Sequence, residues 1–397
     1  MPPGSPGFNQ TSRALDFSGI TTSGSSSSSS SGSSSSSSSI NSVSTTITTT
    51  TTTTDGKMMP LIPENDEAFK TSVYAALRRF ILCVLNGSPK PVTAPDIFKR
   101  AFFAGRPEVE FKENYMQDCA EFLDRLLAIL ADRGQNITNK VGHLFTGLQQ
   151  SLLICKKCNL TSPKDDIITV WNLEIGVQTT VKAAFEATLK LENLPAGDFS
   201  CVDCKEKTSH EKSITIVEPS PVLVLHLKRF SCTESGKSKK IINKLEFDET
   251  LAVVVQNVTY EYSLYSFVVH RGPTMTRGHY YTFFKIGEQW IKADDKPPSL
   301  TNVTWKQCAN EQAYLLLYEL KSTVDEDDEN QRRLSESLLS RTPRMLINSN
   351  VDCYWNSVLW ALSRTKSLVK LLQLDPEQDK AETEKINQER KSKVCYL

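Results

Sequence analysis

The sequence has no apolar run long enough to cross a membrane. Its longest apolar runs, such as residues 251–255 and 313–317, are far shorter than the ~20 apolar residues that a membrane-spanning helix needs. The N-terminal residues also lack the apolar segment of a signal peptide. We therefore expect an intracellular protein, cytoplasmic or nuclear, with no membrane partner.

The sequence also lacks an excess of either charge. Lysine plus arginine equals aspartate plus glutamate, at 46 each. A balanced charge produces no long-range field that would attract nucleic acid or an anionic membrane surface. We therefore expect no nucleic acid partner.

Apolar residues are scarce in the first part of the chain. Residues 21–54 are almost entirely serine and threonine, with only Ile40, Val43 and Ile47 as bulky apolar side chains, and residues 1–57 contain no cysteine. Such a composition cannot bury enough apolar surface to fold. Residues 1–57 are therefore predicted to be a disordered tail.

Apolar periodicity predicts helices first and strands later. Apolar residues recur at intervals of three and four in residues 68–85, 94–103 and 115–130, which is the helical pattern. After residue 144 the pattern becomes strand-like, with one further helix at 181–191. The predicted strands are 167–175, 222–230, 241–247, 251–255, 260–270, 278–286, 290–295 and 313–320.

Four of the ten cysteines form two Cys-x-x-Cys pairs. In an intracellular protein, cysteines are metal ligands, nucleophiles or core residues more often than disulfides. The two pairs are separated by 42 residues and can together surround one tetrahedral zinc ion in a closed, structural site. The alternatives are two unrelated pairs or a redox pair. The predicted zinc ligands are Cys155, Cys158, Cys201 and Cys204.

A single cysteine lies where a polar loop meets a strongly apolar run near residue 353. Asp352 is a plausible N-cap residue, so Cys353 is expected in the first turn of a helix. The unpaired backbone N–H groups and the helix dipole favour a thiolate there. Nearly every residue up to Leu362 is apolar or small, which predicts a buried helix. Cys353 is either a nucleophile or a core cysteine.

A predicted hairpin places a histidine beside a carboxylate. The two-residue loop at 287–288 puts Asp294 on the same face as His279, and Asp295 on the opposite face. A three-residue loop would reverse that choice. We therefore predict that Asp294 orients His279, although such a pair can also be a purely structural ion pair.

Taken together, these motifs resemble those of the ubiquitin-specific protease family of cysteine deubiquitinases. Residues 348–359 resemble its cysteine box, and residues 117–123 resemble its Gln-Gln-Asp-x-x-Glu-Phe segment. The two Cys-x-x-Cys pairs resemble its zinc-binding fingers. Residues 225–230, 278–281 and 290–295 resemble its histidine-box region.

The resemblance implies an α+β, papain-like fold with a helical thumb, a β-rich palm and fingers that carry a structural zinc. It implies ubiquitin and ubiquitinated proteins as partners, and hydrolysis of the bond after the C-terminal glycine of ubiquitin. Cys353 would be the nucleophile and His279 its base, oriented by Asp294. Asn348 matches the position that stabilises the oxyanion, and Asp295 would add a hydrogen bond to the site.

The resemblance also implies a substrate-binding segment and shows departures from the family. Gln117, Asp118 and Glu121 would hold the ubiquitin tail, because carboxylates suit the arginines near its C-terminus. Met116 replaces the first glutamine of this motif. Asp352 replaces a threonine and puts a negative charge beside Cys353.

The order of the motifs differs from that of the family, whose members place the cysteine box first. The simplest interpretation is a circular permutant whose cysteine box docks back into the same domain. The alternatives are that Cys353 begins a truncated second copy of the domain, or that the gene model has its segments in the wrong order. Two other functions remain open: a catalytically weak or inactive ubiquitin-binding pseudo-protease, and a zinc-ribbon interaction module. The expected segments are a tail (1–57), thumb, fingers and palm (58–320), a charged linker (321–345), the cysteine-box helix (346–374) and a charged tail (375–397).

Overall fold

The computed structural model describes one compact unit that lies within Thr49–Leu397. The predicted C-terminal tail lies outside the described residues. So does the predicted N-terminal tail, except for β1 (Thr50–Thr52), which pairs antiparallel with β2 (Met58–Pro60). The described residues are 50–52, 58–60, 67–86, 90–93, 98–99, 102, 115–130, 137–197, 199–232, 238–274, 277–321, 329–349 and 351–373.

Most predicted helices are present with shifted ends. Residues 98–99 and 102 are helical, and the rest of the helix expected at 94–103 lies outside the described residues. The helix predicted from residue 115 begins only at Cys119, because Oδ1 of Asp118 accepts hydrogen bonds from the backbone N–H groups of Ala120 and Glu121 and caps it there. The helices are α1 (Glu67–Leu85), α3 (Cys119–Leu130), α4 (Ile137–Phe145), α5 (Val181–Thr188), α6 (Trp305–Cys308), α7 (Glu329–Leu339), α8 (Cys353–Ser363) and α9 (Lys366–Gln373).

The strands form one eight-stranded sheet, one four-stranded sheet and short pairs. The large sheet has the order β16-β15-β14-β13-β17-β9-β6 with β12 paired to β13, and the smaller one has the order β5-β4-β8-β7. The remaining strands are β3 (Val92–Thr93), β4 (Gly147–Cys155), β5 (Thr161–Ile168), β6 (Trp171–Leu173), β7 (Glu192–Leu194), β8 (His210–Glu218), β9 (Val222–Leu227), β10 (Phe230–Cys232), β11 (Ser238–Lys240), β12 (Thr250–Val255), β13 (Val258–Thr274), β14 (Arg277–Ile286), β15 (Gln289–Asp295), β16 (Pro298–Val303), β17 (Ala313–Leu320) and β18 (Leu346–Ile347).

One predicted strand, at 241–247, is wrong. This segment makes only an isolated bridge, between Glu246 and Thr180. Its backbone carbonyls are used differently, because Nη1 of the buried Arg229 donates hydrogen bonds to the oxygens of Ile241 and Asn243, at 3.2 Å and 3.1 Å. A segment that satisfies a buried guanidinium does not present a regular ladder to a neighbouring strand.

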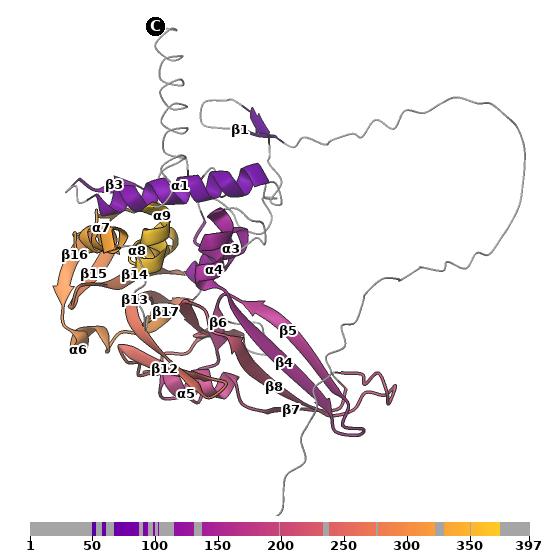
Figure 1. The fold of residues 1–397 in the computed structure, drawn as a ribbon. Helices are drawn as coiled ribbons and strands as arrows, with labels where there is room; N and C mark the ends of the chain where they lie inside the picture. The colour runs from indigo at the N-terminus through magenta and orange to yellow at the C-terminus, as the bar shows by residue number, and fades with distance from the viewer. Residues whose placement is uncertain are drawn as a thin grey trace, which may run out of the picture. The chain divides into compact units, whose positions relative to one another are not determined.

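The large sheet separates two hydrophobic cores, and the helices α1, α3, α8 and α9 cover one of its faces (Figure 1). Alternate residues of β14 point to opposite sides, as the two-residue period of a strand requires. Tyr280 and Phe284 pack in the core beneath the helices, whereas Tyr281 and Phe283 pack in the core on the other face. The four-stranded sheet extends away from these helices (Figure 1).

Helix α8 lies between the large sheet and the other helices. It contacts β13, β14 and β15 on one side, and α1, α3 and α9 on the other. All of its residues are buried, which confirms the prediction of a buried helix beginning at Cys353. A helix that is apolar on nearly every face is stable only inside a core, so this position follows from its composition.

The segment before α8 is part of the folded unit. The sequence predicts a charged linker at 321–345, but α7 within it packs against α9, and the Ser335 hydroxyl donates to Oε1 of Gln373 at 2.8 Å. Further on, β18 pairs in parallel with β3. The backbone N–H of Arg344 also donates to the carbonyl of Val84 at the end of α1. These contacts bind the cysteine-box segment to the N-terminal helix.

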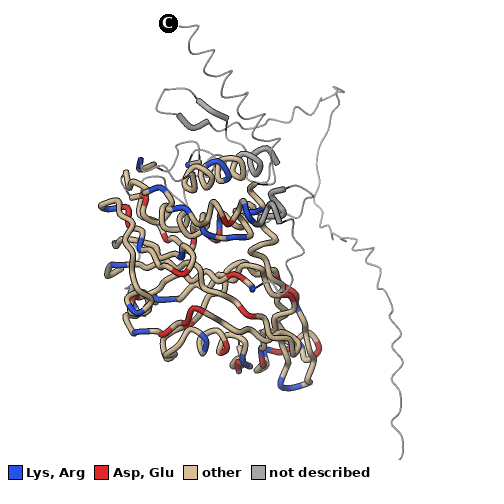
Figure 2. The backbone as a smooth tube through the Cα atoms, turned by 60° about the vertical axis from the view of Figure 1, so that its left-hand side comes forward, with Lys and Arg blue, Asp and Glu red and all other residues tan. Residues whose placement is uncertain are grey.

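Basic and acidic residues are interspersed over the described backbone (Figure 2). This distribution matches the equal numbers of basic and acidic residues in the sequence. Of the helices in the described residues, none is long and apolar enough to cross a membrane.

The packing of α8 makes a stability prediction. Leu359→Ala should lower the free energy of unfolding by about 2–5 kcal/mol, because Leu359 is fully buried and its truncation leaves a cavity. Leu191→Ala is the matched control, since the Leu191 side chain is exposed and its loss should change stability by less than about 0.5 kcal/mol. Urea denaturation of both variants measures the difference, and equal losses would contradict a central position for α8.

Candidate active site

The hairpin of β14 and β15 brings His279 and Asp294 together. Ile286 pairs with Gln289 and Thr282 with Ala293, which confirms the predicted two-residue loop and its register. Nε2 of His279 lies 2.7 Å from Oδ1 of Asp294. Nδ1 is therefore the ring nitrogen that is available to interact with a second side chain.

Cys353 is the second group that interacts with His279. Burial lowers the pKa of His279, but the hydrogen bond to Asp294 and the hydrogen bond and charge of Cys353 outweigh it and raise that pKa to about 10. The cysteine at the start of α8 and the histidine of β14 are therefore near enough to interact. A cysteine side chain beside an imidazole ring is the arrangement of a cysteine nucleophile with its base.

Asp294 is ionised under this arrangement. Burial raises its pKa, but the hydrogen bond with His279 and the backbone N–H of Lys296 outweigh burial and lower it. The Lys296 N–H donates to Oδ1 at 3.2 Å, and Nζ of Lys292 lies 3.8 Å from Oδ2. A carboxylate fixed in this way can hold the imidazole ring in one orientation.

Asp295 points to the other face and joins the hairpin to α8. Its Oδ2 accepts a hydrogen bond from Nδ2 of Asn356 at 2.7 Å, and its Oδ1 lies 3.4 Å from Nδ2 of Asn348. The same Oδ1 is 3.7 Å from Nε2 of His279. Burial is the main cause that raises the pKa of Asp295.

The sequence reading assigned no role to Asn356. The residue lies three positions after Cys353, one helical turn on, so it faces the same side of α8 as the cysteine. The three-residue interval from Cys353 is therefore the feature of the sequence that could have indicated a role for Asn356 in the site. By binding both Asp295 and the carbonyl of Ile347, Asn356 fixes the hairpin end against the loop before α8.

Asp352 is the N-cap residue of α8, as predicted, but its side chain does not cap the helix. Its Oδ2 instead accepts from the backbone N–H of Ser349, and its Oδ1 binds Nζ of Lys99 at 2.6 Å. The backbone N–H of Asp352 donates to Oδ1 of Asn348 at 3.0 Å.

Met116 lies over the cysteine. The Cys353 thiol is 3.8 Å from the Met116 sulfur, and Cys353 is only 1% exposed. A thioether is a weak hydrogen-bond acceptor, so this contact competes little with His279. It does cover one side of the sulfur.

Asp118 is bound within the protein on both of its carboxylate oxygens. Its side chain is buried, with Oδ1 capping α3 and Oδ2 accepting hydrogen bonds from Tyr314 at 2.5 Å and Tyr280 at 3.3 Å. A carboxylate used in this way on both oxygens positions α3 against the sheet and is not presented to a substrate. Of the other two residues predicted to bind substrate, Glu121 is exposed and Gln117 is half-buried.

The four cysteines predicted to bind a metal gather at the far end of the four-stranded sheet. Their sulfur atoms all lie within 4.8 Å of one another, with Cys155 and Cys204 at 3.9 Å and Cys158 and Cys201 at 3.5 Å. Four sulfurs each ~2.3 Å from one zinc ion would lie ~3.8 Å apart in a tetrahedron, so the cluster fits that metal. The hydroxyl of Thr208 lies 3.1 Å from the Cys155 sulfur and is placed to support it.

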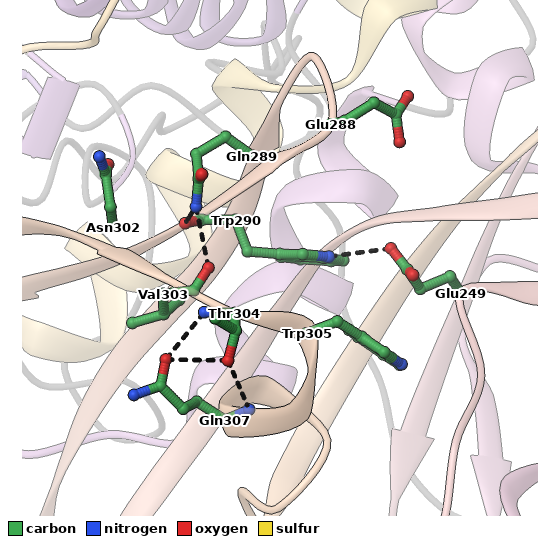
Figure 3. A pocket seen from close by; sticks show the side chains of 9 residues that line it. All are labelled: Glu249, Glu288, Gln289, Trp290, Asn302, Val303, Thr304, Trp305 and Gln307. Atoms are coloured by element: carbon green, nitrogen blue, oxygen red, sulfur yellow. Dashed lines mark hydrogen bonds between the residues drawn. The ribbon is translucent and has the colours of Figure 1, made fainter.

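A pocket of ≈ 330 Å³ lies away from the site around Cys353. It lies near the turn of β14 and β15, the end of β16 and α6 (Figure 3). Its walls include the indoles of Trp290 and Trp305, and Nε1 of Trp290 donates to Glu249 at 2.9 Å. None of the predicted site residues lines it. The pocket is therefore separate from the contacts around Cys353.

Comparison with known proteins gives a family match. The family model described as "Ubiquitin carboxyl-terminal hydrolase" matches residues 23–318, and the match ends before Cys353. "Ubiquitin carboxyl-terminal hydrolase 21" of Arabidopsis thaliana is 30% identical over 233 residues, which are 54% of this chain and 31% of that protein. "Ubiquitin carboxyl-terminal hydrolase 17-like protein D" of Mus musculus is 31% identical over 193 residues, 48% of this chain and 35% of that protein. The chain thus spans about a third of the length of these relatives.

A solved structure confirms the fold class. The SAGA DUB module that contains Ubp8, bound to monoubiquitin, matches with a TM-score of 0.50 and 23% sequence identity, over 66% of this chain and 69% of that one. The α+β, papain-like fold of the ubiquitin-specific protease type predicted from the sequence is therefore correct.

The raised pKa of His279 predicts a pH dependence of stability. Folding binds the His279 proton more tightly than the unfolded chain does, so its stabilising contribution is complete below about pH 6.5 and is lost as the pH rises toward 10. The free energy of unfolding should fall over this range in the unmodified chain and fall less in His279→Gln. Urea titrations at several pH values measure both slopes, and equal slopes would refute the coupling of His279 to Cys353 and Asp294.

Proposed function

Because this chain belongs to the ubiquitin carboxyl-terminal hydrolase family, we propose that it is a thiol-dependent deubiquitinase. It would hydrolyse the bond after the C-terminal glycine of ubiquitin, with Cys353 as the nucleophile, His279 as the base and Asp294 as the orienting carboxylate. The observation that carries this proposal is that the hairpin holds His279 2.7 Å from Asp294, at the end where α8 begins with Cys353, and Cys353 and Asp294 both raise the pKa of this histidine.

The arrangement of this triad supports a thiolate mechanism. The Cys353 thiolate attacks the carbonyl carbon of the terminal glycine, and a tetrahedral intermediate forms. His279 gives its proton to the departing amine, leaving a thioester between Cys353 and ubiquitin. Water then attacks the thioester while His279 takes one of its protons. The intermediate collapses to the carboxylic acid of ubiquitin and the Cys353 thiolate, and the acid then loses its proton to solvent.

The polar groups around Asp295 support the stabilisation of the oxyanion. Asn348 would donate its Nδ2 to the developing negative charge, together with backbone N–H groups at the start of α8. Its amide oxygen is held by the Asp352 N–H, so the Nδ2 end has one orientation. Asp295, held in turn by Asn356, supplies the acceptor that keeps this Nδ2 at the site.

The substrate would be ubiquitin and ubiquitinated proteins. The relative with the shared fold is itself bound to monoubiquitin, which supports this choice. Gln117 and Glu121 would meet the tail of ubiquitin, and Glu121 has the charge that suits its arginines. Asp118 would act only by positioning the start of α3, as its buried contacts require. We place the activity inside the cell.

Zinc would bind to the four-cysteine cluster as a structural ion. The ligands would be Cys155, Cys158, Cys201 and Cys204, whose sulfur spacing fits a tetrahedral site. With four thiolates bound, no coordination position stays open for substrate or water. The ion would hold the end of the four-stranded sheet together and take no part in the chemistry.

The motif order would be that of a circular permutant. The cysteine box follows the sheet in sequence yet lies in the same unit, where α8 contacts both the sheet and α1. In an ordinary member, α9 would lead directly into α1, and here Nε of Arg78 in α1 donates to the carbonyl of Leu372 in α9 at 2.7 Å. This contact supports a cysteine box that docks back into the same domain, as a permutant requires.

One observation favours a second function, a weak or inactive ubiquitin-binding pseudo-protease. Cys353 is almost fully covered, and Met116, which replaces a family glutamine, contacts its sulfur. If the cover does not move, ubiquitin binds without reaction. A zinc-ribbon interaction module is the weaker alternative, because it leaves the triad without a role.

A ubiquitin-based probe with a thiol-reactive group separates these functions. The unmodified chain should become labelled, whereas Cys353→Ser should not, because serine is a far weaker nucleophile in this setting. His279→Ala should slow labelling by roughly a hundredfold or more, since it removes the base. Binding of ubiquitin without labelling would favour the pseudo-protease, and the absence of both would leave the zinc-ribbon module.

Metal analysis of the purified chain tests the zinc site. About one zinc per chain is expected, and Cys204→Ser should lose it, because three thiolates bind zinc more weakly than four. Cys308→Ser is the matched control. Cys308 is buried in the hydrophobic core on the face of the large sheet away from the helices, and it does not belong to the four-cysteine cluster. Retention of zinc in Cys204→Ser together with its loss in Cys308→Ser would rule out the assignment.

A further inference from the structure

The charge next to the nucleophile needs a counter-charge. Asp352 immediately precedes Cys353, and its side chain is only 7% exposed. A buried carboxylate beside a thiolate disfavours the charged sulfur, and water screens such a pair poorly. Any activity of Cys353 therefore depends on what neutralises Asp352.

Lys99 supplies that counter-charge. Its Nζ lies 2.6 Å from Oδ1 of Asp352, and its side chain is 15% exposed. The two residues are 253 positions apart in sequence. The other carboxylate oxygen accepts the Ser349 N–H, so the pair also ties down the loop that leads into α8.

The backbone that carries Lys99 is fixed beside the cysteine box. The ring of Phe98 packs edge-on against Trp355 with centroids 5.6 Å apart, and the ring of Phe102 does so at 5.2 Å. Phe122 of α3 lies 4.5 Å from the same indole. Trp355 follows Cys353 by two residues, so this aromatic contact holds the Lys99 ammonium at the start of α8.

We infer that Lys99 is a positioning residue for the nucleophile, which acts by neutralising Asp352 and fixing the loop before Cys353. The inference rests on the proposed function. It assigns Lys99 a role in catalysis although the side chain binds neither the substrate nor the sulfur directly. It also explains how the chain keeps an acidic residue at the position before its cysteine.

The other titratable residues around Cys353 are the same in every variant of the test. Among the described residues packed against the start of α8, these are His279 of β14, Asp294 and Asp295 of β15, and Asp118 with Cys119 at the start of α3. Because none of them is altered, a change between variants reports the Lys99–Asp352 pair alone.

The experiment measures the rate of labelling by the ubiquitin-based probe between pH 6 and 9, with the full chain. Lys99→Met should slow labelling about tenfold near pH 7 and move the rise of the rate to higher pH, because the bare carboxylate opposes the thiolate. Lys99→Arg should keep most of the labelling rate of the unmodified chain. Lys99→Met combined with Asp352→Asn should recover it too, since the amide oxygen can still accept the Ser349 N–H.

Controls keep the outcomes distinct. Lys321→Met removes an exposed ion pair with Glu261 on the surface and should leave the rate unchanged. Thermal unfolding of every variant shows whether it is folded. A Lys99→Met chain with the rate and pH profile of the unmodified chain would overturn the inference, as would a double variant as slow as Lys99→Met. An unmodified chain that does not react with the probe would instead overturn the proposed function.

Discussion

The burial of α8 is the constraint on which the rest of the structure depends. The helix has almost no polar face, so it must lie between the large sheet and the other helices. Once it lies there, its first residue is fixed against the end of the β14–β15 hairpin. Cys353 meets His279 because an apolar helix must be covered, and the polar contacts of Asn356 then set the remaining orientation.

The contacts that were predictable from the sequence depend on short-range geometry. A two-residue turn fixes the register of a hairpin, and the two-residue period then decides which carboxylate faces His279; both predictions hold. The zinc-type cysteine cluster follows in the same way, because each Cys-x-x-Cys pair is local and four sulfurs suit one tetrahedron. The burial of α8 follows from composition alone.

The contacts that the sequence did not reveal depend on tertiary placement. Asp118 matched a substrate-binding motif, but only the packed structure shows that two tyrosines take up its second oxygen. Asp352 is the predicted N-cap residue, but its carboxylate makes an ion pair with a lysine from a distant segment, which the sequence does not reveal. The segment at 241–247 has strand-like residues, but a buried arginine uses its carbonyls. In each case a tertiary contact uses polar groups that the local pattern had assigned elsewhere or left open, and for Asp118 and Asp352 the partner lies more than 150 residues away.

The position of α8 late in the sequence has a consequence for folding during synthesis. The ribosome completes the large sheet before it makes the helix that covers one of its faces, and β18 can pair with β3 only after more than 200 intervening residues have been made. Contacts between such distant segments form slowly, because a long loop must close first. In that interval the apolar face of β13, β14 and β15 is exposed to water, and such exposed apolar surface favours aggregation of the nascent chain.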